Sequence, residues 1–340
     1  MPSTKKISAV VVNWNDKETL RLCLTSLHKQ DHPNLEIIVS DNGSTDGSQE
    51  MTRQEFPDVL LIENNANLGF GTAVNRGFER ASGDYLTFLN NDLEFAPESF
   101  RALLKQLEEN PGLGGVVPKI LYSQKPEIIN SYGVNIHYTG IACPYLVDQP
   151  DRDDLQPHET ACGGIFLLSR EMYEDIGGFD EGLFLYHEDH DLSWRGRLAG
   201  WHLATCPSAI FYHRYHFNKG TMKYYHSEKN RLYLLLKNLE LKTLLLLLPA
   251  LIITELAQWA HSLLHGWFLL KAKSYSDLIE KLPEILVKRR AIQSSRRVPD
   301  REIARLFQAD LAVSGVQSFI LKRLLNPFYI AYWKCISYWI

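Results

Sequence analysis

The segment DYLTFLNNDLEF, residues 84 to 95, joins an apolar run to a cluster of polar side chains. Residues 84 to 90 have the length and the aromatic and β-branched content of a buried strand. Asn90, Asn91 and Asp92 follow, and an aspartate beside two amides can supply oxygen ligands to Mg²⁺ or Mn²⁺. The same three residues are typical of a turn, so the segment alone leaves both interpretations open.

The residues around this segment repeat the order of strand, polar cluster and helix. Strands are predicted over residues 7 to 12, 35 to 40, 59 to 64 and 114 to 120. Helices are predicted over residues 17 to 29, after 48, over 71 to 81 and from Pro97. Strands that alternate with helices indicate an α/β fold with a mostly parallel sheet covered by helices on both faces.

Polar residues follow each of the first four predicted strands. In a parallel sheet the carboxyl ends of the strands share one edge, and ligands bind beyond that edge. Each cluster alone is typical of a turn or helix cap, but four on one edge favour a nucleotide crevice. The GxGxxG fingerprint is absent after the first strand, which argues against a dinucleotide-dependent oxidoreductase. The clusters contain Asn13 and Asn15, then Asp41, then Asn67, Gly69 and Gly71, and finally Asn90, Asn91 and Asp92.

Composition is ordinary for a globular protein of one large domain or two. The 340 residues are 45% hydrophobic and 22% charged, and the net charge of −4 gives no indication of a nucleic-acid partner. The five cysteines are scattered without a CxxC pair, which favours a reduced, cytosolic chain over a disulfide framework. The first apolar run is too short for a signal peptide and is expected to form a strand.

The segment LYHEDHDLSW, residues 185 to 194, concentrates ionisable side chains between apolar ones. A zinc site could use His187, His190 and Asp191, although the HExxH pattern is absent. A surface helix could carry Glu188 and Asp189 in its first turn, where carboxylates complement the helix dipole. A partly desolvated carboxylate near others has a raised pKa and suits a general base. The residues of this segment do not decide among the three.

Seven segments together resemble the family 2 glycosyltransferases, inverting enzymes of the GT-A fold, and especially their rhamnosyltransferase-like branch. The resemblance covers about residues 7 to 220 and implies a catalytic domain over 1–225. Its nucleotide-sugar half would be 1–120 and its acceptor half 121–225, with a helical C-terminal region over 226–340. The segments, in the family's order, are VVNWN, SDNGSTDGS, NLGFGTAVNRG, FLNNDLEF, GGIFLLSRE, GGFDEGLFLYHEDHDLSWR and FYHR.

The resemblance also implies roles for individual residues. Asp189 would be the catalytic base with Glu188 positioning it, while Asp191 and Arg195 would hold the loop. Asp92 and His213 would bind Mg²⁺ or Mn²⁺, although Asn90 replaces the first carboxylate of the family's DxD motif. The nucleotide-sugar set would be Asn13, Asn15, Asp41, Asn67, Gly69, Asn75, Asn91 and Asp92. The acceptor set would be Gly163, Gly164, Phe166, His187 and Trp194.

The implied function is inverting transfer of a hexose to a hydroxyl group in cell-surface polysaccharide synthesis. The donor would be a dTDP- or UDP-sugar, with L-rhamnose as the sugar that the resemblance suggests. The acceptor would be a saccharide or a lipid-linked saccharide. Two alternatives stay open: a catalytically silent nucleotide-sugar-binding assembly partner, and a metal-dependent hydrolase built on the histidine-rich segment.

Residues 244 to 270 are long and apolar enough to cross a bilayer. Four polar residues at spacings of three and four instead predict an amphipathic helix lying in the membrane interface, with Trp259 and Trp267 at its border. The basic runs 287–290 and 295–297 would meet anionic lipid. We expect a cytoplasmic protein, peripheral on the inner face of the cell membrane; a helical homo-oligomer interface and a true span are alternatives. The four polar residues are Glu255, Gln258, His261 and His265.

Overall fold

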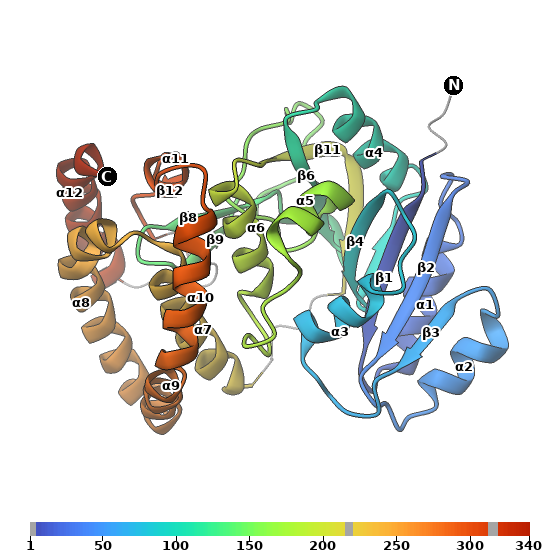
Figure 1. Cartoon of the computed structure of the whole chain (residues 1–340), viewed down its shortest axis with the longest axis horizontal. Coiled ribbons are helices and arrows are strands. Elements are labelled where there is room, and N and C mark those ends of the chain that lie inside the picture. Colours follow the sequence, from blue (N-terminus) through green and yellow to red (C-terminus); the bar gives the residue numbers. More distant parts are fainter. Residues whose placement is uncertain (1–4, 215–219, 312–318) are drawn as a thin grey trace.

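The computed structural model describes residues 5–214, 220–311 and 319–340. Figure 1 shows a twisted sheet flanked by helices and, at the end of the molecule away from the N-terminal strands, a layer of helices from the last third of the chain. The α/β class and the helical C-terminal region are therefore as predicted.

The main sheet is mixed rather than uniformly parallel. Within the described residues its order is β3-β2-β1-β4-β10-β6-β11-β5, with β7 beside β6. The pairs β1–β2, β1–β4, β2–β3 and β6–β11 are parallel, whereas β10 runs antiparallel to β4 and β6, and β5 antiparallel to β11. The strands are β1 Ile7–Asn13, β2 Leu35–Asp41, β3 Leu60–Glu63, β4 Tyr85–Asn90, β5 Leu93–Phe95, β6 Leu113–Tyr122, β7 Lys125–Ser131, β10 Leu167–Ser169 and β11 His202–His213.

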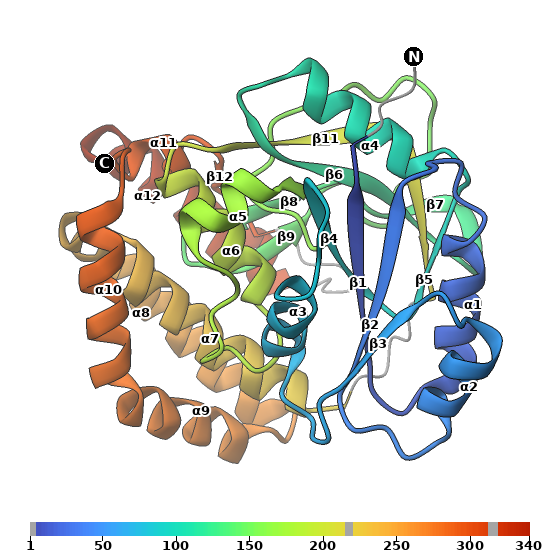
Figure 2. The same ribbon diagram turned by 45° about the vertical axis from the view of Figure 1, so that its right-hand side comes forward.

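Strand β1 is buried along its whole length because helices cover both faces of the sheet. Alternate side chains of a strand point to opposite faces. Ala9 and Val11 pack with α1 (Lys17–Leu27), whereas Val10 and Val12 pack with α3 (Phe70–Phe78). Figure 2 shows these two helices on opposite sides of β1. This burial on both faces explains the continuous apolar run in the sequence.

Four further helices flank the sheet; α2 and α4 lie near their predicted places, whereas α5 was not predicted and α6 was one of the interpretations left open for its segment. Pro97 does not begin a helix; it lies in a turn in which Ser99 N donates to the Ala96 carbonyl at 3.1 Å, and the helix begins at Ser99. These helices are α2 Ser48–Glu55, α4 Ser99–Glu109, α5 Arg170–Ile176 and α6 Glu188–Leu198.

The C-terminal helices are joined tightly to the sheet region. A small sheet, in the order β12-β8-β9, connects Phe307–Gln308 with Val134–His137 and Ala142–Pro144. The predicted boundaries at 120 and 225 fall inside β6 and inside α7, so neither separates independent units. The elements are α7 Met222–Asn238, α8 Leu241–Leu264, α9 Phe268–Glu280, α10 Leu282–Ser295, α11 Arg301–Ala304, the π-helical turn η1 Leu321–Leu325, α12 Asn326–Ile336 and the 3₁₀ turn η2 Ser337–Trp339.

Candidate active site

The polar clusters that end β1, β2 and β4 are hydrogen-bonded to one another. Asn91 Nδ2 donates to Asn13 Oδ1 at 2.8 Å, and Asn13 Nδ2 donates to Asp41 Oδ2 at 2.9 Å. Asn15, whose φ is +51°, accepts a hydrogen bond from Thr45 N at 2.7 Å. The predicted meeting of these clusters at one edge of the sheet is confirmed.

Asp41 is a buried carboxylate that accepts hydrogen bonds from the loops at this edge of the sheet. The residue is fully buried, and it accepts hydrogen bonds from Ser44 N at 2.8 Å, Gln49 Nε2 at 2.7 Å and Asn13. A buried carboxylate is stable only when such donors replace water. Both oxygens of Asp41 thus hold the loop after β2, and contact with a nucleotide would require one of these donors to move.

Gly69 is the point at which the loop before α6 meets the N-terminal half. Asn67 Oδ1 accepts from Gly69 N at 3.0 Å, and Phe70 N donates to the Phe184 carbonyl at 2.9 Å. Gly69 has a φ of +83°, and a Cβ there would collide with that same carbonyl. The position therefore requires glycine for its conformation and for the close backbone approach.

The turn into α6 is held by α7. Tyr186 and His187 have φ values of +67° and +68°, a conformation that costs free energy for residues with a Cβ. Asn230, fully buried on α7, donates to the carbonyls of Leu185 at 2.9 Å and Tyr186 at 2.8 Å. His187 and His190 also approach each other through their Nδ1 atoms at 3.0 Å. Burial lowers the pKa of His187 well below its ordinary value, so its ring is neutral.

Glu188 and Asp189, the first two residues of α6, form a desolvated carboxyl pair. Glu188 is 6% exposed, and its Oε2 accepts no hydrogen bond from the part of the chain that the structure describes. Burial and then the charge of Asp189 raise the pKa of Glu188 to about 8. Burial also raises the pKa of Asp189. A Cβ on Gly164 would lie 3.6 Å from Asp189 Oδ2, so the missing side chain leaves room in front of this carboxylate.

Asp191 points away from this pair. Its Oδ2 accepts from Arg195 Nε at 2.8 Å, and the Arg195 guanidinium also donates to the carbonyls of Ile176 at 2.7 Å and Gly178 at 2.6 Å. The predicted role of Asp191 and Arg195 in holding the loop is confirmed. Burial opposes ionisation, but the charges of Lys237 and Arg195 hold the pKa of Asp191 below its ordinary value. The zinc site with His187 and His190 is wrong, because the Asp191 carboxylate is committed to these cations.

Lys237 on α7 lies between two buried aspartates. Its Nζ is 2.5 Å from Asp180 Oδ2 and 2.6 Å from Asp191 Oδ1, and its side chain is 1% exposed. Asn238 Nδ2 donates to Asp191 Oδ1 at 3.1 Å. Sequence reasoning missed these residues and Asn230; the available signal was polar residues inside the leucine-rich run of α7.

Asp92 and His213 come together as the family resemblance implied. His213 Nε2 lies 3.2 Å from Asp92 Oδ2, and its Nδ1 lies 2.9 Å from Asn130 Oδ1. A hydrogen on Nδ1 would donate to Asn130 and leave the Nε2 lone pair facing Asp92. The described residues contain no group of three or more metal-ligating side chains. An aspartate and a histidine fit Mg²⁺ or Mn²⁺ that takes its other ligands from water and phosphate oxygens.

Four other predicted contacts are corrected by burial or by committed hydrogen bonds. Phe166 is fully buried with its ring 5.0 Å from that of Phe88. Trp194 is 1% exposed, and its ring is 5.6 Å from that of Phe307. Asn75 uses both ends of its amide on the Phe179 backbone, at 2.8 and 3.0 Å. A Cβ on Gly163 would meet Val117 Cγ2 at 2.6 Å. These four residues pack in the core or bind the backbone, so we do not expect them to contact the donor or the acceptor.

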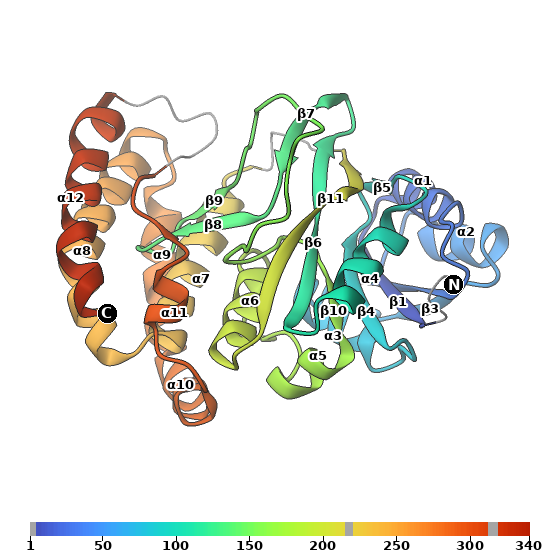
Figure 3. The same ribbon diagram turned by 90° about the horizontal axis from the view of Figure 1, so that it is seen from above.

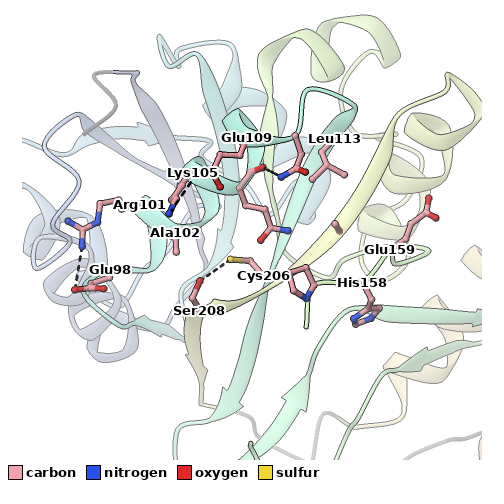
Figure 4. Close-up of a pocket in the computed structure, with 14 residues that line it drawn as sticks. Glu98, Arg101, Ala102, Lys105, Glu109, Leu113, His158, Glu159, Cys206 and Ser208 are labelled. Carbon is pink, nitrogen blue, oxygen red and sulfur yellow. Dashed lines mark hydrogen bonds and ion pairs between the residues drawn. The ribbon is translucent and has the colours of Figure 1, made fainter. Parts of the chain in front are cut away.

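Two cavities lie apart from Asp92 and Asp189. One of about 670 Å³, shown in Figure 4, is lined by α4, by β11 and by residues 157–159. The other, of about 570 Å³, is lined by Asn75, Gly178 and Arg195 among others. Neither cavity is lined by the carboxyl pair or by the Asp92–His213 pair.

A mixed sheet with polar loops along one edge and a desolvated carboxyl pair is an arrangement that suits a sugar-nucleotide-dependent transferase. Residues 8–177 match the Glycosyl transferase family 2 domain, and residues 154–219 match the family described as the N-terminal domain of galactosyltransferase. The chain belongs to glycosyl transferase family 2.

Known proteins agree with this assignment. The N-acetylglucosaminyl-diphospho-decaprenol L-rhamnosyltransferase of Mycobacterium tuberculosis is 29% identical over 240 residues, which cover 63% of this chain and 78% of the relative. This relative confirms the rhamnosyltransferase-like resemblance. The uncharacterized glycosyltransferase YibD of Escherichia coli is 36% identical over 113 residues, 32% of this chain and 33% of that protein.

Two solved structures confirm the GT-A fold. GalNAc-T7 with UDP, GalNAc and Mn²⁺ superimposes with a TM-score of 0.57 at 19% identity. That match covers 68% of this chain but only 47% of GalNAc-T7. The mannosyltransferase PcManGT from Pyrobaculum calidifontis, with GDP-Man and Mn²⁺, gives a TM-score of 0.52 at 15% identity over 99% of this chain and 88% of its own.

Proposed function

We propose that this glycosyltransferase moves a hexose from a nucleotide diphosphate sugar to an acceptor hydroxyl with inversion at the anomeric carbon. The observation that carries the proposal is the carboxyl pair at the start of α6, in which Glu188 is buried and the Asp189 side chain is 17% exposed. The loop before this pair is held on the N-terminal half of the chain by a hydrogen bond from Phe70 N to the Phe184 carbonyl. Such docking brings a proton acceptor within reach of a sugar held at the edge of the sheet.

Asp189 is the general base of the proposed reaction. It takes the proton from the acceptor hydroxyl, whose oxygen bonds to the anomeric carbon as the bond to the diphosphate breaks. The departing electron pair stays on the diphosphate, and attack from the opposite face inverts the configuration. Glu188, with a pKa of about 8, is protonated at neutral pH, which leaves the negative charge of the pair on Asp189.

Asp92 and His213 would hold a divalent cation. When bound, the cation would neutralise charge that develops on the leaving diphosphate. The chain's own contribution is to aim Nε2 of His213 at Asp92 through Asn130. Both solved structures of the same fold contain Mn²⁺, one with UDP and the other with GDP-Man, which supports this part of the proposal.

The donor is proposed to be a dTDP- or UDP-sugar, with dTDP-L-rhamnose tested first because a rhamnosyltransferase is among the relatives. The acceptor is a saccharide or a lipid-linked saccharide, since that relative's name specifies a diphospho-decaprenol-linked sugar.

A donor screen by thermal shift, followed by a transfer assay, tests the proposal. UDP, dTDP and GDP and their sugars are added with and without Mn²⁺; a ligand at 100 times its dissociation constant adds about 2.7 kcal/mol of stability. Asp189→Asn should keep the donor-induced shift but lose transfer by ~100-fold or more, the usual contribution of a general base. Asp153→Asn, in an exposed loop, is the matched control. The anomeric configuration of the product is read by NMR.

Other outcomes would favour the alternatives. Donor stabilisation without turnover in the wild type would indicate a silent binding partner, which the missing carboxylate at Asn90 would explain. Release of the nucleotide diphosphate at the same rate with and without acceptor would indicate a hydrolase. A retained anomeric configuration, or full activity in Asp189→Asn, would refute the single displacement.

A further inference from the structure

Helix α8 is amphipathic with its polar side turned into the protein. Its exposed positions form an apolar stripe at helical spacing, which we call the C-terminal apolar face. Six of these side chains are 48 to 68% exposed. The buried positions include Thr243, Thr254 and Ser262. An ordinary surface helix has the opposite arrangement. The C-terminal apolar face consists of Leu241, Leu245, Leu248, Ile252, Leu256 and Leu263.

A balanced ionic cluster fixes α8 in this orientation. Glu255 of α8 pairs with Arg231 of α7 and with Lys271 of α9, the latter at 2.7 Å, and Glu228 of α7 pairs with both cations. Burial opposes ionisation of Glu255, but Arg231 and Lys271 lower its pKa to about 2. Glu255, which was predicted to lie on the polar face of an amphipathic helix, therefore faces the protein, because its partners are there.

The predicted aromatic and basic contacts with lipid are also corrected. Trp267 is 1% exposed and stacks on Tyr224 at 4.8 Å. Lys288 pairs with Asp180 at 2.5 Å, and Arg289 donates to the carbonyls of Leu236 and Leu239. The basic runs thus hold the helices together.

Neighbouring elements extend the exposed apolar surface. Leu269, at the start of α9, is 80% exposed, and Phe319, next to η1, is 73% exposed. The Tyr332 hydroxyl of α12 donates to the Leu246 carbonyl at 2.8 Å. Figures 1 and 3 both show α8 and α12 side by side at the end of the molecule farthest from β1–β3. The two helices that carry exposed apolar side chains are therefore neighbours and stand clear of strands β1–β3.

The exposed charged side chains of α8 and of residues 319–340 have one sign. Over 241–264 and 319–340, every exposed charged side chain is cationic, and the single carboxylate, Glu255, is turned into the ionic cluster. Two copies meeting through this surface would bring like charges together. A bilayer with anionic lipid complements both the apolar stripe and the cations. The exposed cations are Lys242, Lys322, Arg323 and Lys334.

We propose that the C-terminal apolar face docks this enzyme on one leaflet of an anionic bilayer, with α8 lying in the plane of the membrane. Among the described residues α8 is the one helix long and apolar enough to span, and 22% of its most apolar stretch is buried. Spanning would strip Glu255 from Arg231 and Lys271, so the buried cluster opposes it. Docking goes beyond glycosyl transfer and is measured without donor or acceptor, so its failure is distinguishable from failure of the proposed function.

Vesicle flotation of the full chain tests the proposal, with phosphatidylcholine vesicles that contain or lack phosphatidylglycerol. The wild type should float with the anionic vesicles. The variant Leu245→Ser, Ile252→Ser and Leu256→Ser should lose partitioning by on the order of 100-fold, since three exposed apolar side chains that would enter the lipid are replaced by polar ones. Lys322→Gln with Arg323→Gln should reduce binding roughly fivefold per charge, and only on anionic vesicles.

Leu22→Ser with Leu60→Ser is the matched control, because both residues are exposed and apolar but lie on α1 and β3. Equal thermal midpoints of all variants show that folding is retained. Wild-type protein that stays in solution, or a triple variant that floats normally, overturns the proposal. A wild-type dimer that the triple variant converts to monomer, without vesicle binding, assigns the face to a second copy. Resistance of bound protein to alkaline carbonate extraction would indicate a span and also overturn it.

Discussion

Replacing Lys237 by methionine should strongly destabilise the protein. The ammonium group lies 2.5 Å from Asp180 and 2.6 Å from Asp191, and the side chain is 1% exposed. Methionine preserves most of the aliphatic volume of the side chain but removes the positive charge that lies between the two buried carboxylates. Breaking a buried pair in this way costs about 3–5 kcal/mol. Because Arg195 and Lys288 still pair with the two aspartates, the expected loss is near the lower end, ~3 kcal/mol.

Urea denaturation at neutral pH measures this loss, with Lys5→Met as the control. Lys5 and Asp84 form an exposed pair, with side chains 55% and 45% exposed, and such pairs contribute less than about 1 kcal/mol. Burial opposes ionisation of Asp180 and Asp191, but the charge of Lys237 holds the pKa values of both carboxyls below their ordinary range. A depressed carboxyl pKa gives stability that is present above the unfolded value and lost as pH falls, so the Lys237→Met deficit should shrink in acid.

The double variant Lys237→Met with Asp191→Asn sharpens the test. It removes one of the two carboxylates that have lost the lysine, and it should recover part of the lost free energy of unfolding. A Lys237→Met cost no larger than that of Lys5→Met, or a cost that grows as pH falls, would refute the view that Lys237 neutralises the two aspartates.

Three further predictions concern the site itself. Gly69→Ala should destabilise the protein and reduce transfer more than Gly177→Ala, because both glycines have positive φ but only Gly69 faces a carbonyl at collision distance; urea midpoints and initial rates compare them. Glu188→Gln should gain stability relative to the wild type as pH rises from about 4.5 to about 8, because the buried carboxyl holds a proton that the unfolded chain releases; equal pH slopes would contradict this. His213→Ala should abolish the Mn²⁺ enhancement of donor binding in calorimetry, while Asn130→Ala should weaken it by ~10-fold or more; an unchanged Mn²⁺ effect in both would remove these residues from the cation site.

Local patterning in the sequence was sufficient to predict β1 to β4, β6 and the meeting of the polar clusters, but not β10 and β11, which complete the main sheet. Strand β1 is apolar throughout because α1 and α3 cover it, and parallel strands must end along one edge. Residue type alone failed for Phe166 and Trp194, since aromatic side chains suit a core as well as a sugar. Asn230 and Lys237 were missed because their partners lie 45 and 57 residues away, beyond the reach of helical spacing.

Helix α8 shows a different limit of sequence reasoning. Its periodicity correctly indicates two unlike faces, but periodicity carries no information about which face meets the protein. That choice depends on Arg231 and Lys271, whose charges attract Glu255 inward. The pattern of one helix therefore cannot orient it unless the charges of its neighbours are placed as well.

Helix α7 connects the two surfaces that matter most for the proposed activity. Through Arg231 it holds the polar side of α8, and through Asn230, one residue earlier, it holds the backbone before Glu188 and Asp189. Both sets of contacts are buried, and the ionic one is balanced in charge, so α7 has little freedom to move relative to either. Docking of the C-terminal apolar face would accordingly fix the direction in which the carboxyl pair faces the membrane. We expect membrane docking to leave the conformation of the loop before α6 unchanged. A membrane can shift a conformational equilibrium only where two conformations exist, and the buried contacts of α7 hold a single one.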